Sequence, residues 1–105
     1  MFRIAMTFRL KPGAYAEYKR AHDDLWPEVA RSMSDNDVNM AIYHYQGRLF
    51  LFATAPTEAH WQRSREAPIL AKWMEYMATV IVTDGAGKLI VEPMEEAFVF
   101  GSFAD

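Results

Sequence analysis

The chain has 105 residues, the length of one domain, and the 51% that are hydrophobic exclude a disordered protein. Eleven basic and fourteen acidic residues give a net charge of −3 without a basic cluster, which argues against nucleic acid as a partner. Cysteine is absent, so disulfides, thiolate nucleophiles and thiolate metal sites are excluded.

The first predicted elements are a strand and two helices. Residues 2–10 alternate apolar and polar side chains, which predicts a half-buried strand. Lys11-Pro12-Gly13 ends the strand, and residues 14–25 have the pattern of a helix. Pro27 interrupts that pattern and fits the first position of a second, short helix over residues 27–33. The beginning of the chain has neither the pattern of a signal peptide nor an apolar run long enough to cross a membrane, so we expect a cytoplasmic protein.

The middle of the chain predicts a β-hairpin. Residues 38–45 and 48–55 are rich in apolar and aromatic side chains, and Gln46-Gly47 separates them. Two such runs joined by a tight glycine-containing turn are typical of paired antiparallel strands.

The last third predicts two more helices and a final strand. Thr57 is a good N-cap for a helix over residues 58–65, and Pro68 opens another helix with apolar residues at helical spacing. Leu89–Val91 fits a short strand, and Glu96–Phe100 fits the last main strand.

This order of elements, β-α-β-β-α-β, is that of the ferredoxin-like α+β fold, a four-stranded antiparallel sheet with helices on one face. Residues 1–105 then form a single domain. Phe50 and Leu51 are neighbours that point to opposite faces of one strand, so both faces are expected to be buried. We therefore expect a dimeric α+β barrel, a homodimer through the open sheet face.

Three side chains on the first predicted helix could carry chemistry. Tyr18, His22 and Trp26 stand at steps of four and so share a helix face. In one interpretation they pack on the sheet as a core stripe, and spacing alone favours this one. In the other they line a groove in which the imidazole exchanges protons near neutral pH and the aromatic rings bind a sugar. His44 and His60 stand apart from His22, so the sequence predicts no metal site.

The segment around His22 resembles a known family. Residues 17–28 read EYKRAHDDLWPE, which is similar to the EYxxRHxxIWPEL stretch of the L-rhamnose mutarotase family. The similarity continues through Ala41-Ile42-Tyr43 and through Lys72–Met77, and it extends to about residue 82. The chain is therefore identified as a divergent member of that family.

The resemblance implies a small dimeric enzyme that interconverts the α and β anomers of a free 6-deoxy sugar. Carried over by position, His22 is the proton donor and Tyr18 binds the substrate, while Trp73 is the first member of the family's Trp-Trp pair. We expect Trp26 and Trp73 to supply stacking walls and Tyr43 to be a further substrate-binding residue. No cofactor is required, and a monosaccharide is the expected ligand.

The second acid–base group stays open at this point. His22 is expected to deliver a proton to the ring oxygen, and a water, Tyr43 or Asp23 could take the proton of the anomeric hydroxyl. Any of these would complete the exchange without a metal.

Three departures from the family pattern bear on the sugar. Met40 and Met74 stand where the family usually has tyrosine and tryptophan, and Thr83–Pro93 differs from the family's loop. Both methionines are expected to contact the substrate, with L-rhamnose the leading candidate and L-fucose second. The same barrel also occurs in cofactor-free or haem-linked monooxygenases and in non-catalytic small-molecule-binding domains, which are the alternative functions.

Overall fold

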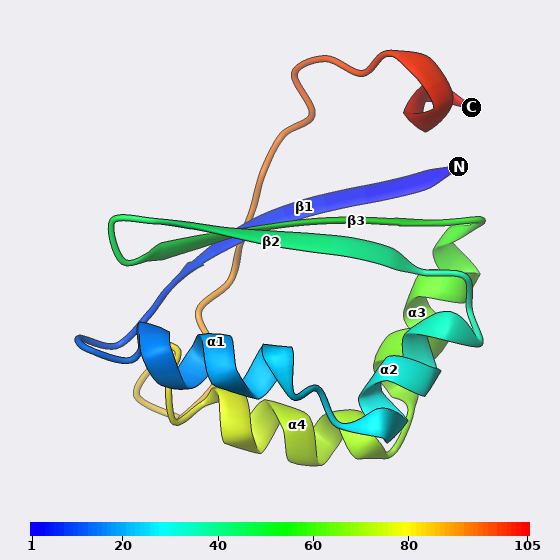
Figure 1. Ribbon diagram of the computed structural model, residues 1–105. Coiled ribbons are helices and arrows are strands. Elements are labelled where there is room, and N and C mark those ends of the chain that lie inside the picture. The colour runs from blue at the N-terminus through cyan, green and yellow to red at the C-terminus, as the bar shows by residue number, and fades with distance from the viewer.

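The computed structural model describes residues 1–105 as one sheet with all α-helices packed against one of its faces (Figure 1). The elements in chain order are β1 (Phe2–Arg9), α1 (Tyr15–Asp23), α2 (Pro27–Ser34), β2 (Asn39–Tyr45), β3 (Arg48–Ala55), α3 (Glu58–Glu66), α4 (Ile69–Met77), β4 (Glu92–Pro93) and a 3₁₀ turn, η1 (Gly101–Ala104). The strands lie in the order β2-β3-β1-β4, and every neighbouring pair is antiparallel. The predicted ferredoxin-like fold is confirmed.

The hairpin forms at the predicted turn. Gln46 and Gly47 both have positive φ, 51° and 75°, which is the backbone of a type I′ turn between twisted strands. Tyr45 then pairs with Arg48 in the β2–β3 ladder. This register decides which side chains of β2 face the helices.

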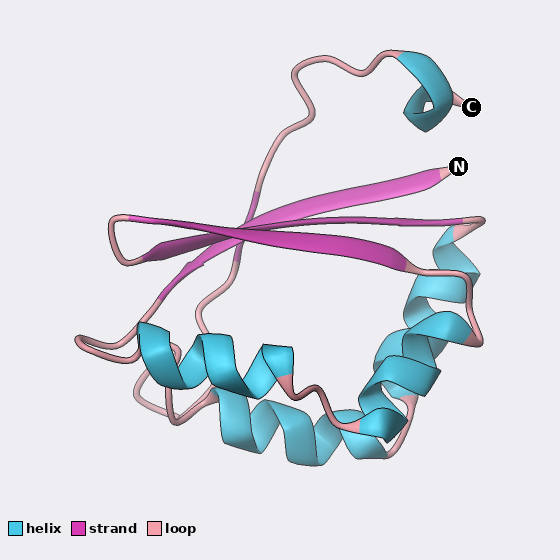
Figure 2. Ribbon diagram, in the orientation of Figure 1, coloured by secondary structure: helices cyan, strands magenta, loops and turns pink.

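The core lies between the sheet and the helices (Figure 2). On β3, Leu49, Leu51 and Ala53 are buried toward the helices, while Phe52 on the alternate face is 37% exposed. The helices supply the large aromatic side chains Trp61 and Trp73, both nearly fully buried. The opposite face of the sheet has no α-helix packed on it, and only the C-terminal segment with η1 lies on that side.

The prediction of a strand at Glu96–Phe100 is wrong. The fourth strand is only Glu92–Pro93, and the chain leaves the sheet after the amide of Met94 bonds to the carbonyl of Ala5 at 3.0 Å. Leu89 makes only an isolated bridge to Thr83. The alternating pattern of residues 96–100 reflects strand propensity, but a strand also needs a neighbour, and within this chain none is beside it.

Candidate active site

His22 lies in the last turn of α1, at a cavity between the helices and the sheet. The cavity has a volume of about 160 Å³ and its lining is mostly hydrophobic. Tyr18 and Trp73 line it together with His22, as the sequence predicted for these three. Tyr18 and His22 meet because they are four residues apart, and their ring centroids are 4.1 Å apart.

One hydrogen bond determines the tautomer of His22. Its Nδ1 lies 2.9 Å from the carbonyl oxygen of Tyr18, one helical turn earlier. A carbonyl can only accept, so Nδ1 carries a proton and donates it. In the neutral ring Nε2 is therefore the unprotonated nitrogen, able to accept a proton.

Burial sets the protonation of both polar side chains. It lowers the pKa of His22, an effect opposed by the hydrogen bond to Tyr18 and by the charge of Asp23. Burial also raises the pKa of the Tyr18 phenol, which is 5% exposed. At neutral pH the site therefore combines a neutral imidazole with a neutral phenol.

Trp73 on α4 forms one wall of the site. Its ring meets His22 edge-on at a centroid distance of 5.2 Å. Trp26 was expected in the same groove but lies on the other side of Trp73, at 5.1 Å, and stacks on Tyr76. It is absent from the cavity lining because α1 ends at Asp23. Pro27 holds the preceding residue in extended backbone, which takes Trp26 off the helix face.

Met40 and Met74, which stand where the family usually has tyrosine and tryptophan, both line the cavity. Met40 reaches it from β2, beside Ile42, and Met74 reaches it from α4. Met74 also lines a wide surface hollow with Leu89 and Val91, and these three residues belong to both spaces. The cavity therefore opens toward the segment Thr83–Pro93, where this chain departs from the family pattern.

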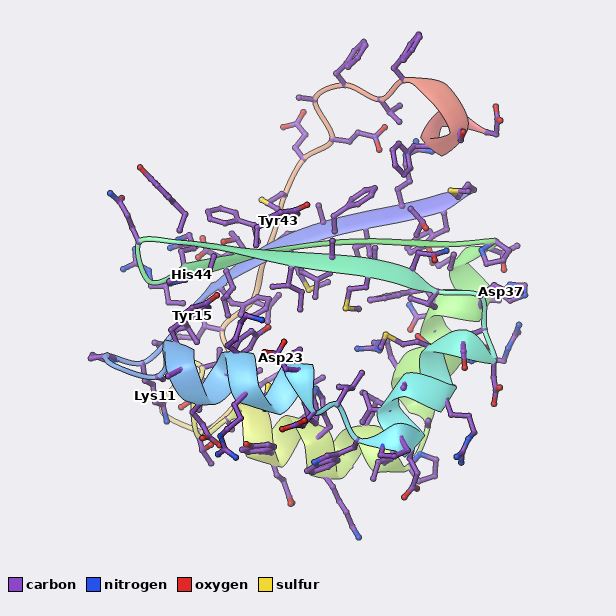
Figure 3. All side chains as sticks on the ribbon, in the orientation of Figure 1. Lys11, Tyr15, Asp23, Asp37, Tyr43 and His44 are labelled. Atoms are coloured by element: carbon purple, nitrogen blue, oxygen red, sulfur yellow. The ribbon has the colours of Figure 1, made fainter.

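Tyr43 is not brought to His22. It lies on the opposite face of the sheet and is 72% exposed, whereas His44 points toward the helices and stacks on Tyr15 at 3.8 Å (Figure 3). Adjacent residues of a strand point to opposite faces, and the turn at Gln46-Gly47 determines which residue faces the core. Tyr43 thus shares no cavity with the imidazole within this chain.

Asp23 has a partner of its own. Its carboxylate accepts two hydrogen bonds from Lys19 Nζ, at 2.7 and 2.9 Å, one helical turn away. The pair borders a second hollow of about 330 Å³, which shares Tyr18, His22, Met40 and Ile42 with the cavity. The carboxylate is thus bonded to Lys19 and not to His22.

Sequence reasoning missed the remaining apolar lining residues of the cavity and its one charged residue, Arg65. It lies four residues after Trp61 on α3, and its Cζ is 4.8 Å from the centroid of the Trp61 ring. The spacing of an aromatic residue and an arginine by one helical turn was the signal that could have identified it. No group of three or more His, Asp or Glu side chains is placed to hold a metal ion, and no helix is long and apolar enough to cross a membrane.

Comparison with known proteins assigns the family. The sequence model of the family described as L-rhamnose mutarotase matches residues 3–100. The chain belongs to the L-rhamnose mutarotase family. It is thereby an isomerase that acts on carbohydrates, as the resemblance around His22 predicted.

Individual members of the L-rhamnose mutarotase family match over most of their length. An L-rhamnose mutarotase of Escherichia coli O8 (strain IAI1) is 30% identical over 101 residues, covering 93% of this chain and 97% of that protein. One from Tolumonas auensis is 31% identical over 84 residues, 77% of this chain and 81% of that protein. The crystal structure of an L-rhamnose mutarotase from Formosa agariphila superposes with a TM-score of 0.80 at 27% identity, covering 96% of this chain and 100% of that chain.

A second solved structure shares the fold of this mutarotase-family chain. An antibiotic biosynthesis monooxygenase superposes with a TM-score of 0.52 at 13% identity, over 92% of this chain and 99% of that chain. At this identity the likeness concerns the fold alone.

Proposed function

We propose that this chain catalyses the mutarotation of a 6-deoxy aldose, with L-rhamnose as the leading substrate and L-fucose as the second. The observation that carries the proposal is the neutral imidazole of His22, whose Nδ1 donates to the Tyr18 carbonyl and whose Nε2 is free to accept a proton. The apolar cavity around it suits the methyl group and C–H faces of a deoxy sugar.

One nitrogen can serve both ends of the reaction. Nε2 of His22 takes the proton of the anomeric hydroxyl as the bond between C1 and the ring oxygen breaks and C1 becomes a carbonyl. The imidazolium then gives that proton to the ring oxygen, which completes the open-chain aldehyde. Rotation about C1–C2 and the same steps in reverse close the ring as the other anomer, so protons and electrons balance without a cofactor.

The other residues of the site have supporting roles in this proposal. The Tyr18 hydroxyl makes no hydrogen bond to another protein group, so it can orient the sugar as a neutral donor. Trp73 supplies a flat apolar wall, and the two methionines contact the sugar from β2 and α4. Tyr43 and Asp23 are not needed as the second acid–base group.

Anomeric exchange measured by NMR saturation transfer tests the proposal. The native chain is expected to accelerate exchange on L-rhamnose or L-fucose more than on D-galactose, and His22→Ala is expected to lose about 10²- to 10⁴-fold of that rate. His60→Ala, at the exposed start of α3, is the matched control and should keep the rate. Equal rates in native and His22→Ala proteins of the same Tm would contradict the role of His22, and no acceleration on any of the sugars would contradict the function.

We also propose that the chain acts as a homodimer through the open sheet face. Tyr43 and Tyr45 are 72% and 67% exposed there, and the tail that leaves the sheet exposes Phe98 and Phe100 by 82% and 80%. Such a concentration of exposed aromatic surface is typical of an interaction site, and a second copy would cover it. A cytoplasmic location remains a prediction.

A further inference from the structure

An arginine without an acidic partner lies in the His22 cavity. The four ion pairs of the protein involve Arg3, Lys19, Arg20 and Arg48. The one hydrogen bond of the Arg65 side chain is a long one, from Nε to Ser64 Oγ at 3.4 Å. The four N–H groups on its two terminal nitrogens are therefore unpaired, and no buried side-chain nitrogen lacks a partner, so these groups reach open space.

The surroundings allow a ligand in the cavity to accept those hydrogen bonds in place of water. Arg65 is half-buried over the face of Trp61, and desolvation lowers the pKa of its guanidinium, which nevertheless stays charged. Thirteen of the fifteen residues that line the cavity are hydrophobic. The terminal N–H groups of this charged donor have no protein acceptor, and a ligand that enters the cavity can accept from them as it displaces water.

We infer that Arg65 binds two neighbouring hydroxyl oxygens of the sugar, those at C3 and C4, and so helps to select the substrate. The inference rests on the proposed function, because that function places C1 of the sugar at His22. His22 on α1 acts at C1, and Arg65 reaches the cavity from α3, which lies at the other end of the helical layer (Figure 1). The planar guanidinium presents paired N–H groups that match two adjacent oxygens.

The methionines strengthen this assignment. Met40 and Met74 offer only weak hydrogen-bond acceptors, so they cannot hold sugar hydroxyls as a phenol would. Arg65 is the one charged residue of the lining, and besides it only Tyr18, His22 and the indoles of Trp61 and Trp73 carry side-chain donors. The apolar remainder of the lining suits the C6 methyl group better than a carboxylate.

The decisive experiment combines one protein change with one substrate change. Arg65→Met is expected to raise KM for L-rhamnose about 10- to 100-fold and to leave kcat within a few-fold, since the contact is remote from C1. For the native chain, kcat/KM should be lower by a similar factor on the 3-deoxy and 4-deoxy analogues than on L-rhamnose. Arg65→Met should show no additional loss on these analogues, because the contact is already missing. The 2-deoxy analogue retains the C3–C4 pair, so the substitution should affect it as it affects L-rhamnose.

Two further variants control the interpretation. Arg63→Met removes an exposed arginine of the same helix and should leave KM unchanged. Arg65→Lys keeps the charge but loses the paired geometry, so it should recover less than a tenth of the lost affinity. Arg65→Met should keep the Tm, because an apolar side chain of similar length still packs on Trp61 and no ion pair is lost.

Calorimetric titration with L-rhamnose separates this inference from the proposed function. If the native chain binds the sugar without accelerating exchange, and Arg65→Met does not bind it, the mutarotase proposal fails and the Arg65 contact stands. Equal binding by both proteins, or no binding by the native chain, overturns the contact. Faster exchange on D-galacturonate than on L-rhamnose, lost in Arg65→Met, would also overturn it by assigning the arginine to a carboxylate.

Discussion

His22 is held neutral by its surroundings while its orientation is set by its own helix. Burial lowers the pKa of the imidazole more than the Tyr18 carbonyl and Asp23 raise it. The same carbonyl assigns the proton to Nδ1. A residue placed this way is ready to accept a proton at neutral pH and to return it within the same reaction.

The pH dependence of exchange follows from this protonation state. As the pH falls through the pKa of His22, Nε2 gains a proton and can no longer accept one, so the rate should fall. Because burial places this pKa below the ordinary value of imidazole, the midpoint of the acid limb is expected below about pH 6.5. A profile of kcat/KM from pH 4.5 to 8 measures it. A rate that instead rises as the pH falls would show that the imidazole acts from its charged form, and an acid limb with a midpoint above the ordinary value would contradict the lowered pKa.

Met40 provides a test of sugar preference. It lines the cavity from β2, so Met40→Tyr should introduce a phenolic hydroxyl at the position where the family usually has one. We expect the ratio of kcat/KM for L-rhamnose over L-fucose to rise roughly three- to tenfold, the worth of one neutral hydrogen bond. Met40→Phe adds the ring without the hydroxyl and should leave the ratio unchanged. The same ratio in the tyrosine and phenylalanine variants would contradict the role of the hydroxyl.

Among the elements, α3 contributes both to the core of the fold and to the wall of the cavity. It carries Trp61 into the core and Arg65 to the cavity wall, and it begins at a well-formed cap. The Oγ1 of Thr57 accepts a hydrogen bond from the backbone N–H of His60 at 3.3 Å. The cap was predicted from the sequence, because a threonine before an acidic first turn is a typical helix start.

Thr57→Ala should lower the free energy of unfolding by about 1 kcal/mol, because one backbone N–H of the first turn loses its partner. Chemical denaturation followed by circular dichroism measures the change. Thr57→Ser keeps the hydroxyl and serves as the control, with a loss of less than half as much. An alanine variant as stable as the native chain would mean that water replaces the cap at no cost.

At the scale of the whole molecule, the two faces of the sheet differ. One face is covered by four helices, and the other has only the segment after β4 above it (Figure 1). That segment is attached by a salt bridge between Arg3 and Glu96, at 2.7 Å, and by an edge-on contact between Phe52 and Phe103. These few contacts leave its other aromatic side chains exposed.

Replacing both Phe98 and Phe100 by serine should convert the proposed dimer to a monomer, because it removes apolar surface that a second copy would bury. Sedimentation velocity should give twice the mass of the chain for the native protein and the mass of one chain for the variant. Lys72→Ser on the exposed side of α4 is the control and should stay dimeric. A native protein that sediments as a monomer at high concentration would contradict the proposed dimer.

Short-range patterns determined much of this protein from the sequence alone. The spacing of four brought Tyr18 beside His22, and the period of two in β2 separated Tyr43 from His44. The turn at Gln46-Gly47 and the order of elements indicated the sheet. Each of these depends on neighbours within one helical turn or one hairpin, which are present in the sequence itself.

Tertiary structure decided which residues share the cavity. Arg65 comes from a helix that meets His22 only once α1 and α3 pack on the sheet; its spacing from Trp61 indicates contact with that indole but does not encode the meeting with His22. Trp26 does not lie in the predicted groove, because α1 ends at Asp23, before this residue. Glu96–Phe100 failed to form the last strand for a related reason: a strand depends on a hydrogen-bonding neighbour, and a residue's own sequence context does not say whether one is there.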